Sequence, residues 1–369
     1  MLRKYRFRDY DFKLVAMLIM ISVIGILVVG SAEKSIQNKQ IMGLILGVFL
    51  MVIISLFDYS VLLKLYWVFY IGNMVLLLMV RYFGDDVNNA RRWISIAGIT
   101  FQPSETAKIL LILFYAQFIM KYKEKLNTFR ILAASVLLIL PPWLLINKQP
   151  DLSTSIVILI VFCVILFMGG LSYKIIFSFL AIVVPAAVIF LAIVLQPDQT
   201  LIHGYQQERI FAWLYPEKYA STTAYQQMNS VMAIGSGQLF GKSLGNSSIM
   251  SMKNGNFIPE PQTDFIFTIV GEELGFIGSV IVIVLLMLIA IECLMIGKNS
   301  KDLAGTIICS GIAAIIGFQS FINIGVTTMV LPNTGLPLPF VSAGLTSLVS
   351  LYIGMGFVLN IRLQGKKYN

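Results

Sequence analysis

The segment TDFIFTIVGEELGFIGSVIVIVLLMLIAIECLMI, residues 263–296, decides the fold. From Leu274 to Ile296 it carries a single charged side chain, and roughly 20 apolar residues are enough for a helix to cross a bilayer. Because lipid offers no partner to a backbone amide or carbonyl, such a run must satisfy its own hydrogen bonds as a helix. The segment therefore predicts a membrane-spanning helix.

The same pattern recurs along the chain. Of its 369 residues, 58% are hydrophobic and only 12% are charged, and the mean hydropathy is +0.85. Soluble domains carry roughly 25% charged residues, about twice as many. We expect an all-α integral membrane protein with about ten transmembrane helices and a single polytopic membrane domain over residues 1–369. The predicted spans are 12–31, 40–57, 59–80, 104–120, 129–147, 152–170, 174–196, 263–296, 302–325 and 337–361.

The distribution of positive charge predicts the orientation. Most lysines and arginines fall in segments on the same side as the N-terminus, which is the cytoplasmic side by the positive-inside rule. Both termini are then cytoplasmic, and the net charge of +9 mainly sets orientation. No basic patch interleaves with aromatic residues in a polar region, so we expect no nucleic-acid partner.

One long outer loop, residues 197–262, holds most of the polar sequence outside the spans. Its segment YQQERIFAWLYPEKY (205–219) is typical of a short amphipathic helix lying in the membrane interface. The segment AIGSGQLFGKSLGNSS (233–248) carries four glycines, which indicates either a tightly turning backbone or a loop that approaches a ligand. We expect this loop to cover an outward-facing cavity.

Metal and redox chemistry find little support in the sequence. The three cysteines lie inside apolar runs, and the chain has one histidine, His203. No metal site is predicted and no cofactor is required, although a divalent cation could assist a reaction that releases pyrophosphate.

Charged residues at the outer ends of the spans are costly unless they are paired or functional. Glu105 and Lys108 stand three residues apart, on one face of a helical turn, and predict an ion pair near the interface. Lys148 and Asp151 fall at the same outer level, and Asp151 is well placed to cap the next helix.

Asp264 stands where the first quoted segment enters the membrane. It could cap the helix, but the prolines of IPEP (258–261) fix the entry more rigidly than a cap requires. In a straight helix Glu272 and Glu273 would reach the middle of the bilayer. A carboxylate at a polar cleft can take a proton from a hydroxyl while cations stabilise a departing pyrophosphate. The cations offered by the outer face are Arg91, Arg92, Lys108, Lys148 and Arg209.

The chain resembles the SEDS family of membrane proteins, which includes RodA, FtsW and SpoVE. The resemblance covers nearly the whole chain and rests on motifs in the same order. They are NNARRWISIAGITFQPSETAK (88–108), KQPDLSTSI (148–156), YQQMNSVMAIGSGQLFGKSLG (225–245), IPEPQTDFIFTIVGEELGFIG (258–278) and NIGVTTMVLPNTGLPLPFVSAG (323–344). The C-terminal motif departs from the family's pattern at Ala343 and Leu345, where an aromatic residue and a glycine are usual.

The resemblance implies a multi-pass protein of the bacterial cytoplasmic membrane that polymerises lipid II into peptidoglycan glycan strands at the outer face. The family works with a class B penicillin-binding protein, and its catalytic aspartate falls on Asp264. Its other sensitive positions fall on Trp93, Glu105, Lys108 and Asp151. Arg91, Arg92, Lys148 and Arg209 are charge-based candidates for holding the pyrophosphate. The opening RFRDYDFKLV favours the elongation, RodA-like branch, with division and sporulation members as alternatives.

Two other functions stay open. A lipid II flippase would explain Glu272 and Glu273 at mid-depth, together with Gln319 and Asn323 in the ninth span and a re-entrant segment at the proline-rich stretch 332–339. The repeated halves common in transporters are not visible. A non-catalytic scaffold of the cell-wall synthase would not need Asp264. Glu260, Glu272 and Glu273 are equally interpreted as polar groups of the structure or of the cavity.

Overall fold

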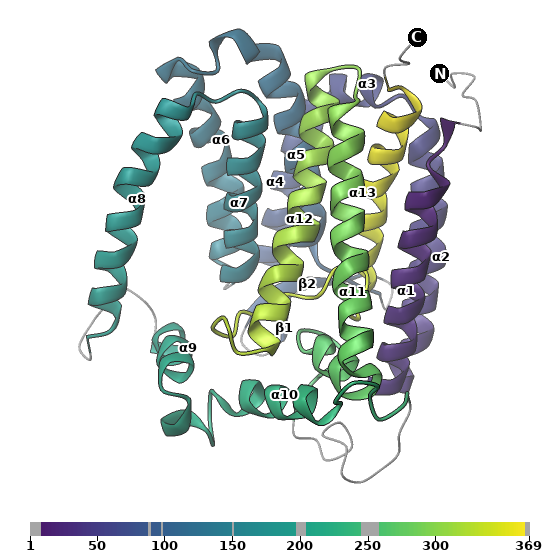
Figure 1. The fold of residues 1–369 in the computed structure, drawn as a ribbon. Helices are drawn as coiled ribbons and strands as arrows, with labels where there is room; N and C mark the ends of the chain where they lie inside the picture. Colours follow the sequence, from purple (N-terminus) through teal and green to yellow (C-terminus); the bar gives the residue numbers. More distant parts are fainter. Residues whose placement is uncertain are drawn as a thin grey trace.

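The protein forms a helical bundle with a small sheet and two short helices at one end (Figure 1). The computed structural model describes residues 9–87, 90–96, 99–149, 151–196, 204–244 and 258–365. The long helices are α1 (Phe12–Ala32), α2 (Lys34–Leu56), α4 (Tyr66–Phe83), α5 (Pro103–Tyr122), α6 (Phe129–Asn147), α7 (Leu152–Met168), α8 (Tyr173–Val194), α11 (Ile266–Lys298), α12 (Leu303–Thr327) and α13 (Leu345–Leu363). The short helices are α3 (Tyr59–Leu62), η2 (Leu63–Leu65), η3 (Lys123–Lys125), α9 (Gly204–Leu214), η4 (Pro216–Tyr219) and α10 (Tyr225–Ser236).

Each predicted span contains a helix. Among the described residues, 8 helices are long and apolar enough to cross a membrane, counting Tyr59–Phe83 as one, and α7 is a shorter apolar helix. The remaining long helix, α5, carries Glu105 and Lys108 in its first turns. A tight turn joins the second and third spans, where the Asp58 carboxylate caps α3 by accepting a hydrogen bond from the Ser60 amide. The all-α membrane fold is confirmed.

The bundle has two distinct ends (Figure 1). The start of α1 and the end of α13 lie at one end, which we call the inner end, and α9 and α10 lie at the other, the outer end. Most residues of α5, α12 and α13 are buried, whereas the described side chains along most of α8 are exposed. The core therefore sits around α12, with α8 at its margin.

The last predicted span begins too early. Helix α13 starts at Leu345, and residues 332–344, which we call the buried loop, are not helical. Three prolines interrupt this stretch, Gly335 has φ +76°, and Phe340 has φ +63°. No residue of the loop is exposed, so its backbone needs partners from the protein.

Side chains of neighbouring helices supply those partners. From α12, Gln319 donates to the Pro337 carbonyl at 2.9 Å and Asn323 donates to the Leu336 carbonyl at 2.6 Å. From α2, Gln40 donates to the Ser342 carbonyl at 3.0 Å. These bonds allow an irregular backbone to lie inside the bundle.

Helix α11 is broken, so the predicted depth of its two glutamates is wrong. Gly275 has φ 67° and ψ −163°, which separates residues 266–274, the half-helix, from residues 276–298. The second part is long enough to cross a hydrocarbon core of about 30 Å by itself. Glu272 and Glu273 therefore precede the straight span and lie at the outer end, next to the segment that follows α10 (Figure 1).

The outer end also carries β1 (Asp85–Val87), β2 (Ala90–Ile96) and β3 (Ile99–Phe101), an antiparallel sheet of order β1-β2-β3. In its register Asp86 faces Arg91 and Ile94 faces Phe101. The predicted amphipathic helix is α9, and the Trp213 indole donates to the Met329 carbonyl at 3.2 Å beyond the end of α12. Parts of the long outer loop, residues 197–203 with His203 and residues 245–257, lie outside the described residues.

Candidate functional site

Asp264 lies where the chain enters the half-helix. The residue at the N-cap of α11 is Phe265, and no side chain caps this helix, so the capping interpretation of Asp264 is wrong. Asn323 donates to the Asp264 backbone carbonyl at 2.8 Å and also holds the buried loop. A Cβ atom at Gly335 would stand 3.1 Å from the Asp264 carboxylate oxygen, so the loop passes directly beside the acid.

Charged groups from separate outer elements surround this carboxylate. Burial raises the pKa of Asp264 to about 6, while Arg92 and Arg209 pull it down and Asp151 and Glu260 push it up. Partial exposure leaves the side chain within reach of solvent. A carboxyl group with this pKa is ionised at neutral pH and basic enough to accept a proton.

The two arginines are anchored to backbone carbonyls. Arg92, on β2, donates to the Gln149 carbonyl at 3.2 Å, and Arg209, on α9, donates to the Asn333 carbonyl at 3.3 Å. Asn333 belongs to the buried loop, so α9 and the loop are joined beside Asp264. The structure thereby brings two of the four predicted anion-binding residues to the acid.

Asp151 is confirmed as a helix cap. Its carboxylate accepts a bond from the Thr154 amide at 3.2 Å at the start of α7, and from the Ser104 hydroxyl at 3.4 Å. Its neighbour Ser153 donates to the Thr334 carbonyl of the buried loop. Asp151 is 3% exposed, so its charge acts on Asp264 through protein rather than through water.

Glu105 and Lys108 form the predicted ion pair, but inside the protein. The Lys108 ammonium lies 2.8 Å from Glu105, and their side chains are 2% and 3% exposed. Lys108 also donates to Gln319 at 2.9 Å, and Ser347 donates to the second Glu105 oxygen at 2.7 Å. Because Gln319 holds the Pro337 carbonyl, this pair supports the loop that flanks Asp264.

The other predicted residues lie on β2, at the end of α6 and in the half-helix. Arg91 is exposed on β2, and Lys148 is exposed at the C-cap of α6. Trp93 is half-buried on β2, opposite Asp85. Glu272 and Glu273 are buried against Lys242 and Ser31, at 3.0 and 2.6 Å. Within the described parts of the chain, no group of three or more His, Cys, Asp or Glu side chains is arranged to hold a metal ion.

A sequence model of the family described as cell cycle protein, FtsW/RodA/SpoVE, matches residues 10–367. The chain belongs to the FtsW/RodA/SpoVE family. The peptidoglycan glycosyltransferase MrdB of Escherichia coli K12 is 35% identical over 300 residues, which cover 80% of this chain and 77% of MrdB. The probable peptidoglycan glycosyltransferase FtsW of Bacillus subtilis is 32% identical over 380 residues, with 98% and 92% covered.

Two solved structures share the fold. A chain of a peptidoglycan synthase complex that coordinates polymerization and crosslinking superposes with a TM-score of 0.77 at 28% identity, covering 96% of this chain and 97% of its own. The rod-shape-determining protein RodA of Thermus thermophilus superposes with a TM-score of 0.70 at 27% identity, covering 97% and 98%.

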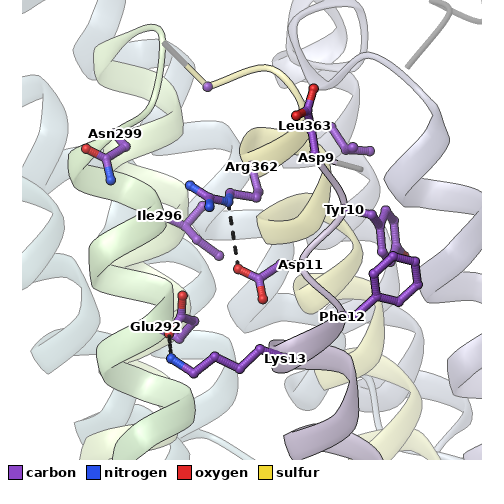
Figure 2. A pocket seen from close by; sticks show the side chains of 11 residues that line it. Asp9, Tyr10, Asp11, Phe12, Lys13, Glu292, Ile296, Asn299, Arg362 and Leu363 are labelled. Carbon is purple, nitrogen blue, oxygen red and sulfur yellow. Dashed lines mark hydrogen bonds and ion pairs between the residues drawn. The ribbon is translucent and has the colours of Figure 1, made fainter. Parts of the chain in front are cut away.

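This FtsW/RodA/SpoVE protein has a polar cavity of about 460 Å³ at its inner end (Figure 2). Its charges are paired between helices: Lys13 lies 2.6 Å from Glu292, and Arg362 lies 3.8 Å from Asp11 (Figure 2). These pairs tie the start of α1 to the ends of α11 and α13. Asp264 lies at the opposite end of the bundle.

Sequence reasoning missed the role of Gln319 and Asn323 in the site. They stand four residues apart on one face of the most buried helix, and both hold the backbone of the buried loop. The sequence carried a signal for this role: two amide side chains stand at helical spacing within an apolar span, and a proline-rich segment follows them.

Proposed function

We propose that this protein polymerises lipid II into peptidoglycan strands at the outer face of the cytoplasmic membrane, with Asp264 as the general base. The observation that carries the proposal is an aspartate freed from capping, with a pKa of about 6, between two anchored arginines at the outer end of a membrane bundle. The relatives' names state the same class of reaction.

The reaction follows from these groups. The Asp264 carboxylate takes the proton from the 4-hydroxyl of the acceptor sugar as that oxygen bonds to the anomeric carbon of the donor. The bond from this carbon to the donor phosphate breaks, and undecaprenyl pyrophosphate leaves with the electron pair. Arg92 and Arg209 stabilise the negative charge that develops on the pyrophosphate. A positioned base typically contributes about 10²–10⁴-fold in rate.

The other polar residues support this reaction. Lys108, Glu105 and Asp151 fix the buried loop and the start of α7, and so fix the wall beside Asp264. We assign the first contact with the lipid-linked substrate to Arg91 and Trp93 on β2 and to Lys148 at the C-cap of α6. A divalent cation could assist the pyrophosphate, but the reaction as written does not require it.

We also infer that a class B penicillin-binding protein is the partner and that its transmembrane helix docks between α11 and α12. An apolar groove of about 440 Å³ lies there, lined by residues such as Met287, Gly317 and Phe321. Small residues such as Gly317 let a second helix approach closely within lipid, where packing rather than hydrophobicity drives association. The relative seen in a synthase complex supports a partner that crosslinks.

A flippase is not proposed, because the two glutamates do not lie at mid-depth and the proline-rich stretch serves as the wall beside Asp264. Glu272 and Glu273 lie outside the straight span and bond to neighbouring segments, and Gln319 and Asn323 hold the buried loop. Residues that line a transport path at the bilayer midplane would not be committed in this way.

The test is glycan polymerisation by the purified protein on labelled lipid II, with and without the partner, for wild type and Asp264→Ala. We expect polymer from the wild type and none from a folded Asp264→Ala protein that still binds the partner. Equal polymer from both would move catalysis away from Asp264. If neither makes polymer with the partner present, the protein is a scaffold or a transporter.

A further inference from the structure

Another part of the chain forms backbone hydrogen bonds across the break in α11. Residues 237–243, which we call the strap, follow α10 and lie along the break at Gly275. The amides of Lys242 and Ser243 donate to the carbonyls of Glu272 and Glu273, at 3.0 and 3.2 Å. In return, the amides of Phe276 and Ile277 donate to the strap carbonyls of Gln238 and Leu239, at 2.8 and 3.2 Å. The strap thus satisfies backbone groups on both sides of the break.

Glycines make this approach possible. A Cβ atom at Gly237 would stand 2.0 Å from the Gly271 carbonyl oxygen, and one at Gly241 would stand 2.1 Å from that of Glu273. A Cβ atom at Gly275 would stand 2.3 Å from the Gly241 amide nitrogen. At these positions any side chain collides with backbone. Gly235, just before the strap, has no heavy atom within 4 Å of its Cβ position.

Side chains lock the same junction. Lys242 pairs with Glu272 at 3.0 Å, and the Glu272 side chain is 1% exposed. Ser31, at the outer end of α1, donates to Glu273 at 2.6 Å. On the preceding turns, the hydroxyls of Ser230 in α10 and Thr268 in the half-helix are hydrogen-bonded. The half-helix is therefore held from α1, α10 and the strap together.

The half-helix carries Asp264 at its entrance. Residue 264 precedes the first helical residue, Ile266, by two positions, and its carbonyl is bonded to Asn323 of α12. Any rotation of the half-helix about the break would move the carboxylate relative to Gly335, Arg92 and Arg209. Among the described residues of the outer loop, the strap is the part that bonds directly across that break.

We propose that the strap is a positioning element for the reaction, in which Gly241 and Lys242 hold the half-helix at the angle that sets Asp264 among its arginines. The proposal rests on the proposed function. It assigns no substrate contact to Gly241 or Lys242, which act through Asp264. The four glycines in the 233–248 segment are explained in part by this close backbone approach.

The experiment compares four strap variants in the full-length protein with its partner. Gly241→Ala and Lys242→Gln disturb the junction, Lys242→Arg conserves the charge, and Gly235→Ala is the matched control with open space. We expect kcat for lipid II polymerisation to fall on the order of 10²-fold in Gly241→Ala, because a misplacement of about 1 Å costs that much. The kcat of Lys242→Gln should fall less, and the kcat of Lys242→Arg should recover most of that loss. KM should change little in these variants, and Gly235→Ala should match the wild type.

Two readouts separate positioning from mere stability. The acid limb of the pH–rate profile should move in Lys242→Gln and return in Lys242→Arg, because the limb reports the surroundings of Asp264. Independently of activity, the rate of thiol labelling at Asp264→Cys, with Cys163→Ser as background, should change when Lys242→Gln is added and stay the same with Gly235→Ala.

Unchanged kcat, acid limb and labelling rate in folded Gly241→Ala and Lys242→Gln proteins would overturn the proposal. The labelling result tests the strap even if the polymerase assignment fails. Equal polymer from wild type and Asp264→Ala, with labelling that depends on Lys242, would reject the catalytic assignment and keep the strap as the element that orients residue 264.

Discussion

The buried Glu105–Lys108 pair offers the sharpest test of how the site is supported. Replacing Lys108 by Met leaves the Glu105 carboxylate, 3% exposed, without its cation, and deprives Gln319 of a donor. Glu105 keeps its bond from Ser347 at 2.7 Å. Breaking a buried pair by removing one partner costs about 3–5 kcal/mol, and the remaining hydroxyl bond places the expected loss of unfolding free energy near the lower figure, about 3 kcal/mol.

A double-mutant cycle isolates the cause. Glu105→Gln together with Lys108→Met removes both charges, and the double variant should lose only about 1 kcal/mol, since replacing a whole buried pair is often nearly neutral. The matched control is Lys13→Met, because Lys13 pairs with Glu292 at 2.6 Å but its side chain is 63% exposed. Glu292 is 11% exposed and lines the cavity at the inner end, where water can replace the lysine, so the control should lose less stability than Lys108→Met.

Reversible unfolding in mixed micelles, followed by tryptophan fluorescence, measures these differences. The polymerisation rate should fall further in Lys108→Met than in the double variant, because the unpaired charge shifts the buried loop beside Asp264. A loss in Lys108→Met no larger than in Lys13→Met would refute the reasoning, as would a double variant as unstable as the single one.

Two further predictions concern the groove and the charge on Asp151. Gly317→Leu should fill the α11–α12 groove and lower co-purification of the partner at least several-fold. The control is Gly72→Leu, at another glycine with open space around its Cβ position, and it should leave co-purification unchanged. Equal binding by both variants would place the partner elsewhere. Asp151→Asn keeps the helix cap, since Asn caps as well as Asp, but it removes a charge that raises the pKa of Asp264. The acid limb of the pH–rate profile should therefore move to lower pH. An unmoved limb would show that Asp151 acts only as a cap.

The spans were predictable because lipid forces the chain into a helix and sets the number of apolar residues that the helix needs to cross the bilayer. Each apolar run became a helix, and Asp151 caps α7 as its local sequence indicates. The errors fall where the chain departs from helix inside the bundle. At Gly275 a positive φ breaks α11, and the start of α13 moves to Leu345 because prolines and Gly335 form the buried loop. Neither break is visible as a change in hydropathy.

The site itself was predictable in part. Asp264, Arg92, Arg209 and Asp151 come together as expected from their outer position. Arg91 is the immediate neighbour of Arg92, yet the alternation of side chains along β2 sends the two residues to different surroundings. The sequence does not reveal such a short strand within a predicted outer segment of a helical protein, so the two arginines could not be told apart.

The most direct test of Asp264 as the base is the pH dependence of kcat for lipid II polymerisation in wild type and Asp264→Asn. A general base works in its ionised form, so the wild-type rate should fall as pH drops through about 6, the pKa of Asp264, and lose about tenfold for each further unit. Asp264→Asn should keep its fold, because an uncharged amide tolerates burial at least as well as the carboxylate. Its residual rate should be on the order of 10²–10⁴-fold lower, without that acid limb. An Asp264→Asn protein that polymerises at the wild-type rate, or that keeps the same acid limb, would contradict the assignment.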